Sequence, residues 1–337
     1  MKNPVNVAIV GATGAVGETM LKVLAEREFP IRELHLLASA RSAGEKVEYG
    51  ARKIVVEDLA TFDPAGIDIA LFSAGGDVSK EYAPKFAAAG AVVIDNSSAF
   101  RYDDDVPLVV SEVNPEALRD RPRGIVANPN CSTMQMLTAL APIHRAVGIE
   151  RINVATYQSV SGTGRRALEE LGRQTAALLN FQDPKPEVYP VQIAFNVIPH
   201  GGDFQDNGYT SEEMKLVWET RKILGDDSIQ VNPTVVRVPV FYGHSEAVHI
   251  ETREKIDATR ARELLASAPG VEVVDEREGG GYPTPVTHAS GNDPVYVGRI
   301  REDISHPRGL DLWIVADNIR KGAALNAVQL AELVIAE

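Results

Sequence analysis

The sequence has few features that would place it in a membrane, an oxidising compartment or a complex with nucleic acid. Cysteine occurs 1 time in 337 residues, so no internal disulfide can form and a reducing cytoplasm is the expected location. Apolar runs fall short of the roughly 18 residues of a membrane span, and MKNPVNVAIVG does not resemble a signal peptide. Basic residues number 34 against 47 acidic ones, and the net charge of −13 argues against a general nucleic-acid binder. A small anion in a local basic pocket remains compatible with this charge.

The first half of the chain alternates short apolar runs with helical patterns. Val5–Val10 is nearly continuous in apolar residues, which is typical of a buried parallel strand. Apolar residues at 16, 20, 23 and 24 follow with the spacing of one helix face. Further strands are expected at 34–39, 67–73, 92–96, 108–110 and 124–128, and a helix capped by Asp77 is expected at 78–89. This rhythm predicts an α/β fold with a doubly wound, Rossmann-type sheet.

From about residue 151 the strands become longer, and several alternate polar and apolar residues as antiparallel strands do. Strands are expected at 151–160, 234–240, 245–253, 294–303 and 310–318, and helices at 165–180, 211–224, 258–268 and 322–336. Thr210 and Glu213 form a capping box before the second of these helices. We predict one domain at 1–132, completed by a C-terminal helix at 319–337, and an α+β domain at 133–318 with a mostly antiparallel sheet.

A glycine loop, GATGAVG at 11–17, follows the first strand and opens the first helix. Glycines there allow a tight turn close to a phosphate, and the helix N-terminus offers N–H groups and a positive dipole end. The spacing is G-x-x-G-x-x-G, so only the strand–loop–helix context gives the motif weight. It predicts dinucleotide binding, with a structural turn as the alternative. The expected contacts are Gly11, Thr13, Gly14, Ala15 and Val16.

The end of the second strand indicates which dinucleotide would bind. An NAD site usually places an acidic residue there for the ribose 2′-hydroxyl. In this chain Ser39, Arg41 and Ser42 stand in its place, and they suit a 2′-phosphate. NADP is therefore the expected cofactor, against the alternative that Arg41 is an ordinary solvated arginine.

Cys131 lies in the segment NPNCST, between an expected strand and the start of a helix pattern at 132–144. A thiol at a helix N-terminus typically has a lowered pKa, because the dipole stabilises the thiolate. The alternative is an inert buried thiol, which is common. Pro129 and Asn130 mark a loop rather than a core strand, so a reactive cysteine is favoured.

Nearly the whole chain resembles the aspartate-β-semialdehyde dehydrogenase family. The resemblance is carried by GATGAVG, SARSAG, NSSAFR, NPNCST, YQSVSGTG, FNVIPH, DNGYTSEEMK, the run from Arg237 to His244, and ADNIRKGAA. The NPNCS and GH elements are specific, whereas the glycine loop is not. The family reduces β-aspartyl phosphate with NADPH, releasing phosphate and giving aspartate semialdehyde. That reaction lies on the path to lysine, methionine, threonine and isoleucine.

The resemblance implies a role for individual residues of the second half. Cys131 resembles the nucleophile that forms an acyl-enzyme thioester, and Gln158 the residue that orients the substrate there. His244 resembles the acid/base. Ser161 and Gly162 resemble contacts to the nicotinamide end of the cofactor, and Asn318 resembles a further cofactor contact late in the chain.

The resemblance also implies how the substrate would be held. Arg101 and Lys215 resemble the cations that bind phosphate. Glu212 resembles the partner of the substrate amine, and Arg237 the partner of its α-carboxylate. A planar arginine fork suits a carboxylate because it can bind both oxygens.

The residues themselves leave alternatives open for these roles. Glu212 and Lys215, three apart on one helix, could form an ordinary surface ion pair. Arg101 has possible partners in the aspartates at 103–105. Arg237 points opposite to its valine neighbours by the strand period, so it need not be buried unpaired. No metal is expected. His249 lies in the same expected strand as His244 and is interpreted as structural, and the other five histidines have no motif support for chemistry. The loop at 201–206 is a local departure from the family pattern.

Three other functions remain to be separated from this one. N-acetyl-γ-glutamyl-phosphate reductase also acts through a thioester intermediate. Its substrate has no free amine, so it would not need a partner such as Glu212. A glyceraldehyde-phosphate-type dehydrogenase usually binds NAD. Arg41 and Ser42 disfavour this function, because they stand where an NAD site has an acidic residue. A non-catalytic nucleotide sensor could use the same fold. The family assembles through the sheet of the second domain, so a homodimer is expected and a tetramer stays open.

Overall fold

The computed structural model describes residues 3–337 of the chain. Residues 1 and 2, with which the expected first domain and the segment MKNPVNVAIVG begin, lie outside the described residues. The chain divides into two compact units. The first unit runs up to Asn130 and resumes with Ala323–Glu337, and the second unit is Cys131–Gly322. Across residues 3–337, none of the helices combines the length and the apolar character that crossing a membrane requires.

The first unit contains a seven-stranded sheet in the order β3-β4-β2-β1-β5-β6-β7. Its strands are β1 (Val5–Val10), β2 (Ile31–Ala38), β3 (Lys46–Tyr49), β4 (Arg52–Asp58), β5 (Ile69–Phe72), β6 (Val92–Asp95) and β7 (Ile125–Ala127). All neighbours pair in parallel except β3 and β4, which pair antiparallel. The chain moves outward from β1 in both directions, which confirms the predicted doubly wound fold.

Three helices belong to the first unit: α1 (Ala15–Glu26), α2 (Gly76–Ala88) and α7 (Asn326–Val334). Apolar side chains of α1 and α7, including Met20, Leu24 and Val328, share one buried core with the sheet. The C-terminal segment thus completes the first core although the whole second unit separates it from β7 in sequence. The predicted final helix began at 322, which is too early, because a π-helical turn at Arg320–Leu325 precedes α7.

Three expectations for the first unit were wrong or incomplete. Residues 108–110 form no strand, and only an isolated bridge joins Leu108 to Ala127. Asp77 does not cap α2, because the helix begins at Gly76, two residues earlier than expected, and is capped by Gly75, whose φ of +94° favours glycine. Asp77 lies instead in the first turn, where a carboxylate still complements the helix dipole. The β3–β4 hairpin was not predicted, since nearly all residues of its two strands are exposed or half-buried.

The second unit contains a six-stranded sheet in the order β11-β12-β13-β10-β8-β9. Its strands are β8 (Ile149–Gln158), β9 (Gln230–Arg237), β10 (His244–Thr252), β11 (Val271–Val273), β12 (Val295–Glu302) and β13 (Gly309–Ala316). The three central pairs are antiparallel and the two edge pairs are parallel. The sheet is therefore mixed, with the predicted antiparallel majority.

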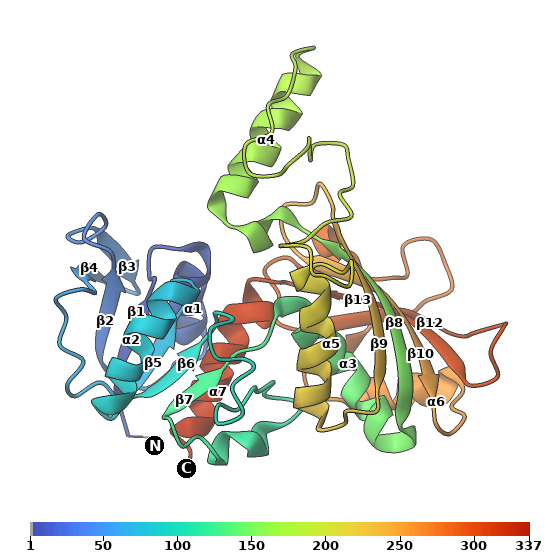
Figure 1. Cartoon of the computed structure of the whole chain (residues 1–337), viewed down its shortest axis with the longest axis horizontal. Coiled ribbons are helices and arrows are strands. Elements are labelled where there is room, and N and C mark those ends of the chain that lie inside the picture. The colour runs from blue at the N-terminus through green and yellow to red at the C-terminus, as the bar shows by residue number, and fades with distance from the viewer. Residues whose placement is uncertain (1–2) are drawn as a thin grey trace. The chain divides into compact units, whose positions relative to one another are not determined.

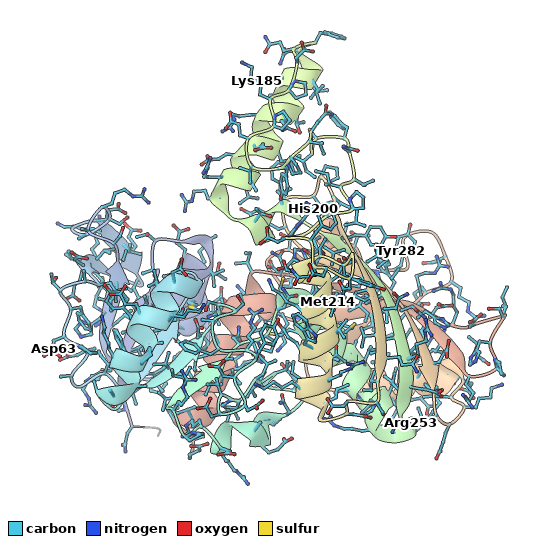
Figure 2. The ribbon with its side chains drawn as sticks, viewed as in Figure 1. Asp63, Lys185, His200, Met214, Arg253 and Tyr282 are labelled. Carbon is cyan, nitrogen blue, oxygen red and sulfur yellow. The ribbon has the colours of Figure 1, made fainter. Side chains whose placement is uncertain are left out.

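The helices of the second unit are α3 (Cys131–Val147), α4 (Arg165–Leu179), α5 (Ser211–Leu224) and α6 (Ala258–Ala266). The predicted capping box of Thr210 and Glu213 is present at the start of α5 and is confirmed. Helices α3, α5 and α6 pack against the sheet. Helix α4 instead projects from it as an arm (Figure 1), and Lys185 lies near the far end of this arm (Figure 2).

Candidate active site

The glycine loop of the first unit joins β1 to α1 through close backbone contacts. Gly11 has φ +87°, and a Cβ there would lie 2.6 Å from the carbonyl oxygen of Ser73. A Cβ on Gly17 would collide with the carbonyl oxygen of Gly11. Gly14 caps α1, and no side chain caps the helix. This arrangement leaves the N-terminal end of α1 to backbone N–H groups, which is the chemistry that a cofactor phosphate requires.

The residues expected to select the cofactor lie in a turn that follows β2 directly. Ser39 accepts a hydrogen bond from the backbone N–H of Ser42 at 2.9 Å, which closes this turn. Ser39 and Arg41 are exposed, and Ser42 is half-buried. The turn thus presents one cation and two hydroxyl groups at the carboxyl end of a central strand, where α/β sheets bind nucleotides.

Arg101 is a nearly buried cation of the first unit. Its Nε donates to the backbone carbonyl of Asn128 and its Nη2 to that of Asn96, both at 2.9 Å. The aspartates considered as its partners, Asp103 and Asp105, bind Arg123 at 2.7 and 3.2 Å. Arg101 is therefore held by backbone carbonyls of the segments that follow β6 and β7.

Cys131 is the first residue of α3 and is partly exposed. The backbone of Gly322 lies against it, since a Cβ on Gly322 would be 2.5 Å from the Cβ of Cys131. Gln158, at the end of β8, donates from Nε2 to Ser132 Oγ at 2.9 Å. Gln158 Oε1 is buried and has no hydrogen-bond partner within residues 3–337. The first turn of α3 therefore brings the thiol and this amide to one place.

His244 is the first residue of β10 and is fully buried. The backbone N–H of Ser159 donates to its Nδ1 at 3.0 Å, and the hydroxyl of Ser159 lies 3.1 Å from the same atom. A backbone N–H can only donate, so Nδ1 accepts and the neutral ring carries its hydrogen on Nε2. Nε2 is buried, and among the described residues it has no hydrogen-bond partner. One polar atom of the ring is thus fixed and the other is left for a ligand.

The surroundings of His244 oppose a positive charge on its ring. Burial lowers the pKa of His244 well below the usual value, and the nearby cation of Arg237 lowers it further. The backbone of Gly243 acts in the opposite direction and does not overcome these effects. His244 is therefore a neutral imidazole near pH 7.

Arg237 and His244 reach the same small space beside Gly162. A Cβ added to Gly162 would lie 3.2 Å from Arg237 Nη1 and 3.3 Å from His244 Nε2. Arg237 ends β9, is nearly buried, and has its Nη1 3.5 Å from the carbonyl oxygen of Ser159. The missing side chain of Gly162 thus keeps open a space that a cation and an imidazole N–H both face.

Asn318 closes the other side of this cluster. Its Oδ1 accepts hydrogen bonds from Ser159 Oγ, Ser161 Oγ and the backbone N–H of Gly243, at 3.0, 3.1 and 3.0 Å. Its Nδ2 is buried with no partner in the part of the chain that the structure describes. An amide donor in this position suits a ligand carbonyl group, such as the carboxamide of a nicotinamide ring.

Glu212 and Lys215 form an ion pair in the first turns of α5, and both side chains are largely shielded. The loop before this helix packs closely, because a Cβ on Gly201 would lie 2.8 Å from Val235 Cγ1. Figure 2 shows His200 at the start of that loop and Met214 on α5. The ion pair that the sequence left open as an alternative is present, and a substrate amine would have to share Glu212 with Lys215.

Sequence reasoning missed Ser159, which binds both His244 and Asn318. The available signal was its place in YQSVSG between two residues that the resemblance did select. In residues 3–337, no group of His, Cys, Asp and Glu side chains is arranged to hold a metal ion. The second unit alone brings together six of the predicted residues around this cluster: Cys131, Gln158, Ser161, Gly162, Arg237 and Asn318, with His244 at its centre.

Comparison with protein families matches both parts of the chain. Residues 6–121 match the model for the NAD binding domain of semialdehyde dehydrogenases, and residues 140–321 match the model for their dimerisation domain. The first range contains the strands of the Rossmann-type sheet up to β6, and the second contains all strands of the mixed sheet.

Individual relatives are similar over the whole length. The chain is 64% identical to an aspartate-semialdehyde dehydrogenase of Legionella pneumophila, covering 99% of this chain and 96% of that protein. It is 56% identical to one of Aquifex aeolicus, covering 98% of each. A crystal structure of aspartate semialdehyde dehydrogenase II from Vibrio cholerae, complexed with ASA, is 58% identical, with a TM-score of 0.98 and 99% of each chain covered. Sequence, both domain models and structure agree, and the chain belongs to the aspartate-semialdehyde dehydrogenase family.

Proposed function

We propose that this protein catalyses the NADPH-dependent reductive dephosphorylation of L-aspartyl 4-phosphate to L-aspartate 4-semialdehyde, through a thioester on Cys131. The reaction supplies lysine, methionine and threonine biosynthesis. One observation carries the proposal: Arg237 and the Nε2–H of His244 face one space beside Gly162, in the unit whose longest helix begins with Cys131. A carboxylate clamp, a proton-bearing ring and a thiol are the groups that acyl transfer to sulfur needs.

We assign the first unit to cofactor binding and the second to catalysis and dimerisation, as in the domains predicted at 1–132 with 319–337 and at 133–318. The backbone of Gly11–Val16 would hold the phosphates, because the N-terminal end of α1 offers its N–H groups and a side chain on Gly11 would collide with the backbone of Ser73. Ser39, Arg41 and Ser42 would bind the 2′-phosphate. Ser161, Gly162 and the unpartnered Asn318 amide fit the nicotinamide end. When bound, NADPH would supply the hydride that reduces the thioester.

The role of Arg41 can be measured directly. We expect Arg41→Ala to weaken NADPH binding far more than NADH binding, because a charge-assisted hydrogen bond to the 2′-phosphate is lost, about 1.5–3 kcal/mol. Fluorescence titration with each cofactor gives the two dissociation constants. Arg52→Ala, another exposed arginine of the first unit, is the matched control and should change neither. Equal losses for both cofactors would show that Arg41 has only a structural role.

The first chemical step belongs to Cys131. Its sulfur attacks the acyl carbonyl, the new C–S bond replaces the C–O bond to phosphate, and phosphate leaves with the bonding electrons. Splitting one difficult displacement into two steps lowers each barrier. The Gln158 amide, held by Ser132 beside the thiol, would orient the carbonyl that is attacked. In the second step the reduced carbon expels sulfur, and the C–S electron pair returns to Cys131.

His244 would handle the proton at the substrate oxygen. Its Nε2–H is the polar atom left for a ligand, and Ser159 prevents the ring from turning its proton the other way. A neutral ring can share this hydrogen with the oxygen that becomes negative when hydride adds to the thioester. The low pKa of His244 matters here, because a charged ring beside Arg237 would add a second buried cation.

The remaining charged residues would select the substrate. Arg237 suits the α-carboxylate and Glu212 the amine, whereas Arg101 and Lys215 suit the departing phosphate. In an acidic protein, local cations select small anions by the geometry of their contacts rather than by long-range attraction. In the absence of substrate, Glu212 and Lys215 neutralise each other. The substrate amine would compete for Glu212, and the substrate phosphate would compete for Lys215.

The assay that tests this function is phosphate-dependent reduction of NADP with aspartate semialdehyde. We expect turnover with this substrate, and little with N-acetylglutamate semialdehyde or glyceraldehyde 3-phosphate. The N-acetylated substrate has no charged amine for Glu212, and the phosphorylated one has no α-carboxylate for Arg237. Absence of turnover with all three, together with NADP binding, would favour a nucleotide sensor instead.

We also infer a cytoplasmic homodimer built through the second unit. The matched dimerisation model spans this unit. On the sheet face away from α3, an apolar groove of about 400 Å³ is lined by Ala247, Leu312, Trp313 and prolines. Tyr157 is partly exposed, and its ring lies 5.6 Å from that of Trp313 in a tilted arrangement. Analytical ultracentrifugation should give a molecular mass of twice that of the chain. A tetramer would require a second interface.

A further inference from the structure

Glu246 is a buried carboxyl group that the proposed mechanism does not use. It lies on β10 two residues after His244, so both side chains face the same side of the sheet. It is fully buried, and neither of its carboxyl oxygens has a hydrogen-bond partner within residues 3–337. An ionised carboxylate in this position would lose its hydration with no compensating hydrogen bond.

Gln135 connects this carboxyl to both elements of the candidate site. It lies on α3 and is fully buried. Its side chain is close enough to the Glu246 carboxyl to influence the pKa of that group. Its Nε2 lies 3.4 Å from the backbone carbonyl oxygen of His244. It also follows Cys131 by four residues, which places the two on one helix face. Gln135 therefore bridges the strand of the imidazole and the helix of the thiol.

The atoms around Glu246 lack one hydrogen-bond donor. Gln135 Oε1 is buried without a partner among the described residues, and like an ionised carboxylate it can only accept. Thr156 lies directly opposite Glu246 on β8, and its hydroxyl likewise has no partner in residues 3–337. The hydroxyl can supply one hydrogen to the carboxyl, but not a second to the amide oxygen.

A proton on the carboxyl would satisfy all three groups. The acid O–H could donate to Gln135 Oε1, Thr156 could donate to the other carboxyl oxygen, and Gln135 Nε2 would stay on His244. Burial also raises the pKa of Glu246 well above its usual value, and the opposing effect of Gln135 is smaller. Geometry and burial thus favour the same protonation state.

We propose that Glu246 is a positioning residue that works as a neutral carboxylic acid: its O–H holds the Gln135 amide, which fixes the His244 end of β10 against the first turns of α3. Glu246 touches no reacting atom in this role. The kinetic part rests on the proposed roles of Cys131 and His244, whereas the protonation state does not depend on them.

Two variants separate the hydrogen bond from the charge. Glu246→Gln keeps a neutral donor of nearly the same shape, so we expect kcat to stay within about 3-fold of the wild type. Glu246→Met removes the donor at similar volume, and we expect kcat to fall roughly 10-fold or more, because small errors in placement are costly. The KM for phosphate should change little in both.

Val248→Ala is the matched control for lost packing. Val248 lies two residues further along the same face of β10 and is also buried, but it has no polar group. This variant should lose stability without the loss of kcat. If Glu246→Met behaves like Val248→Ala at equal loss of melting temperature, the positioning role is wrong.

Two measurements do not depend on the substrate. Infrared spectra of the wild type at about pH 8, where an ordinary carboxyl is ionised, should show a protonated-carboxyl band that Glu246→Gln removes. Glu246→Met should change the rate at which iodoacetamide alkylates Cys131, and Glu246→Gln should not. The proposal is overturned if the wild type lacks the band, or if Glu246→Met and Glu246→Gln change the alkylation rate of Cys131 equally. If the wild type shows the band and the alkylation pattern but no turnover of aspartate semialdehyde, the proposed function fails instead.

Discussion

Cys131→Ala should abolish turnover while leaving the fold and NADPH binding nearly intact. Alanine keeps the Cβ that packs against Gly322, so the variant removes only the sulfur. Without the sulfur no thioester can form, and the remaining groups would have to catalyse a direct displacement, which is the difficult reaction that covalent catalysis avoids. Steady-state kinetics, circular dichroism and a fluorescence titration with NADPH measure the three properties separately.

Chemical modification gives an independent test, because Cys131 is the only cysteine. One equivalent of iodoacetamide should inactivate the wild type, and phosphate together with NADP should protect it. The alanine variant should take up no label. Appreciable turnover by a folded Cys131→Ala protein would rule out the covalent route.

Arg237→Ala and Lys215→Ala should damage different substrates. In the phosphate-dependent oxidative direction, we expect Lys215→Ala to raise the KM for phosphate and to leave that for semialdehyde less affected. Arg237→Ala should do the reverse and should also lower kcat, because a carbonyl that is no longer held loses its attack geometry. Each substrate is varied at saturating NADP.

Conservative substitutions sharpen this comparison. Lys215→Arg should keep partial function, since a flexible point charge can be replaced by another cation. Arg237→Lys should not recover, because one ammonium cannot bind both carboxylate oxygens. Arg260→Ala, which breaks an exposed pair with Glu263 in the same unit, serves as the control. Identical KM changes for Lys215→Ala and Arg237→Ala would show that the two anions are not bound in separate pockets.

Local signals in the sequence predicted the elements that carry the site. The helix starting at Ser211 was predicted at its observed bounds, because Thr210 and Glu213 satisfy each other within one turn. Buried strands such as β1 were predicted from continuous apolar runs, which need no tertiary information. The edge strand β3 and its neighbour β4 consist mostly of exposed and half-buried residues and have no long apolar run, so their pairing could not be foreseen.

The contacts of the site required the folded chain. Ser159 and His244 are 85 positions apart, and only the pairing of β8 with β10 brings the backbone N–H of one to the ring of the other. The place of Glu246 beside Gln135 has the same origin, because a glutamate on an alternating strand looks like a solvated residue until the helix that covers it is known. Sequence motifs named most of the candidate residues, but not these hydrogen-bond partners.

The contact between Cys131 and Gly322 also closes a loop, because these residues are the first and last of the second unit. About 190 residues leave the first unit and return to it through two ends that touch. Once the second unit has folded, its two ends are already held together. Folding of the first unit then no longer includes the entropy loss of closing this loop, which is roughly 3–5 kcal/mol. An insertion with adjacent ends interrupts its host at little cost. Cys131 therefore lies where the chain enters the inserted unit, in contact with the residue at which the chain leaves it.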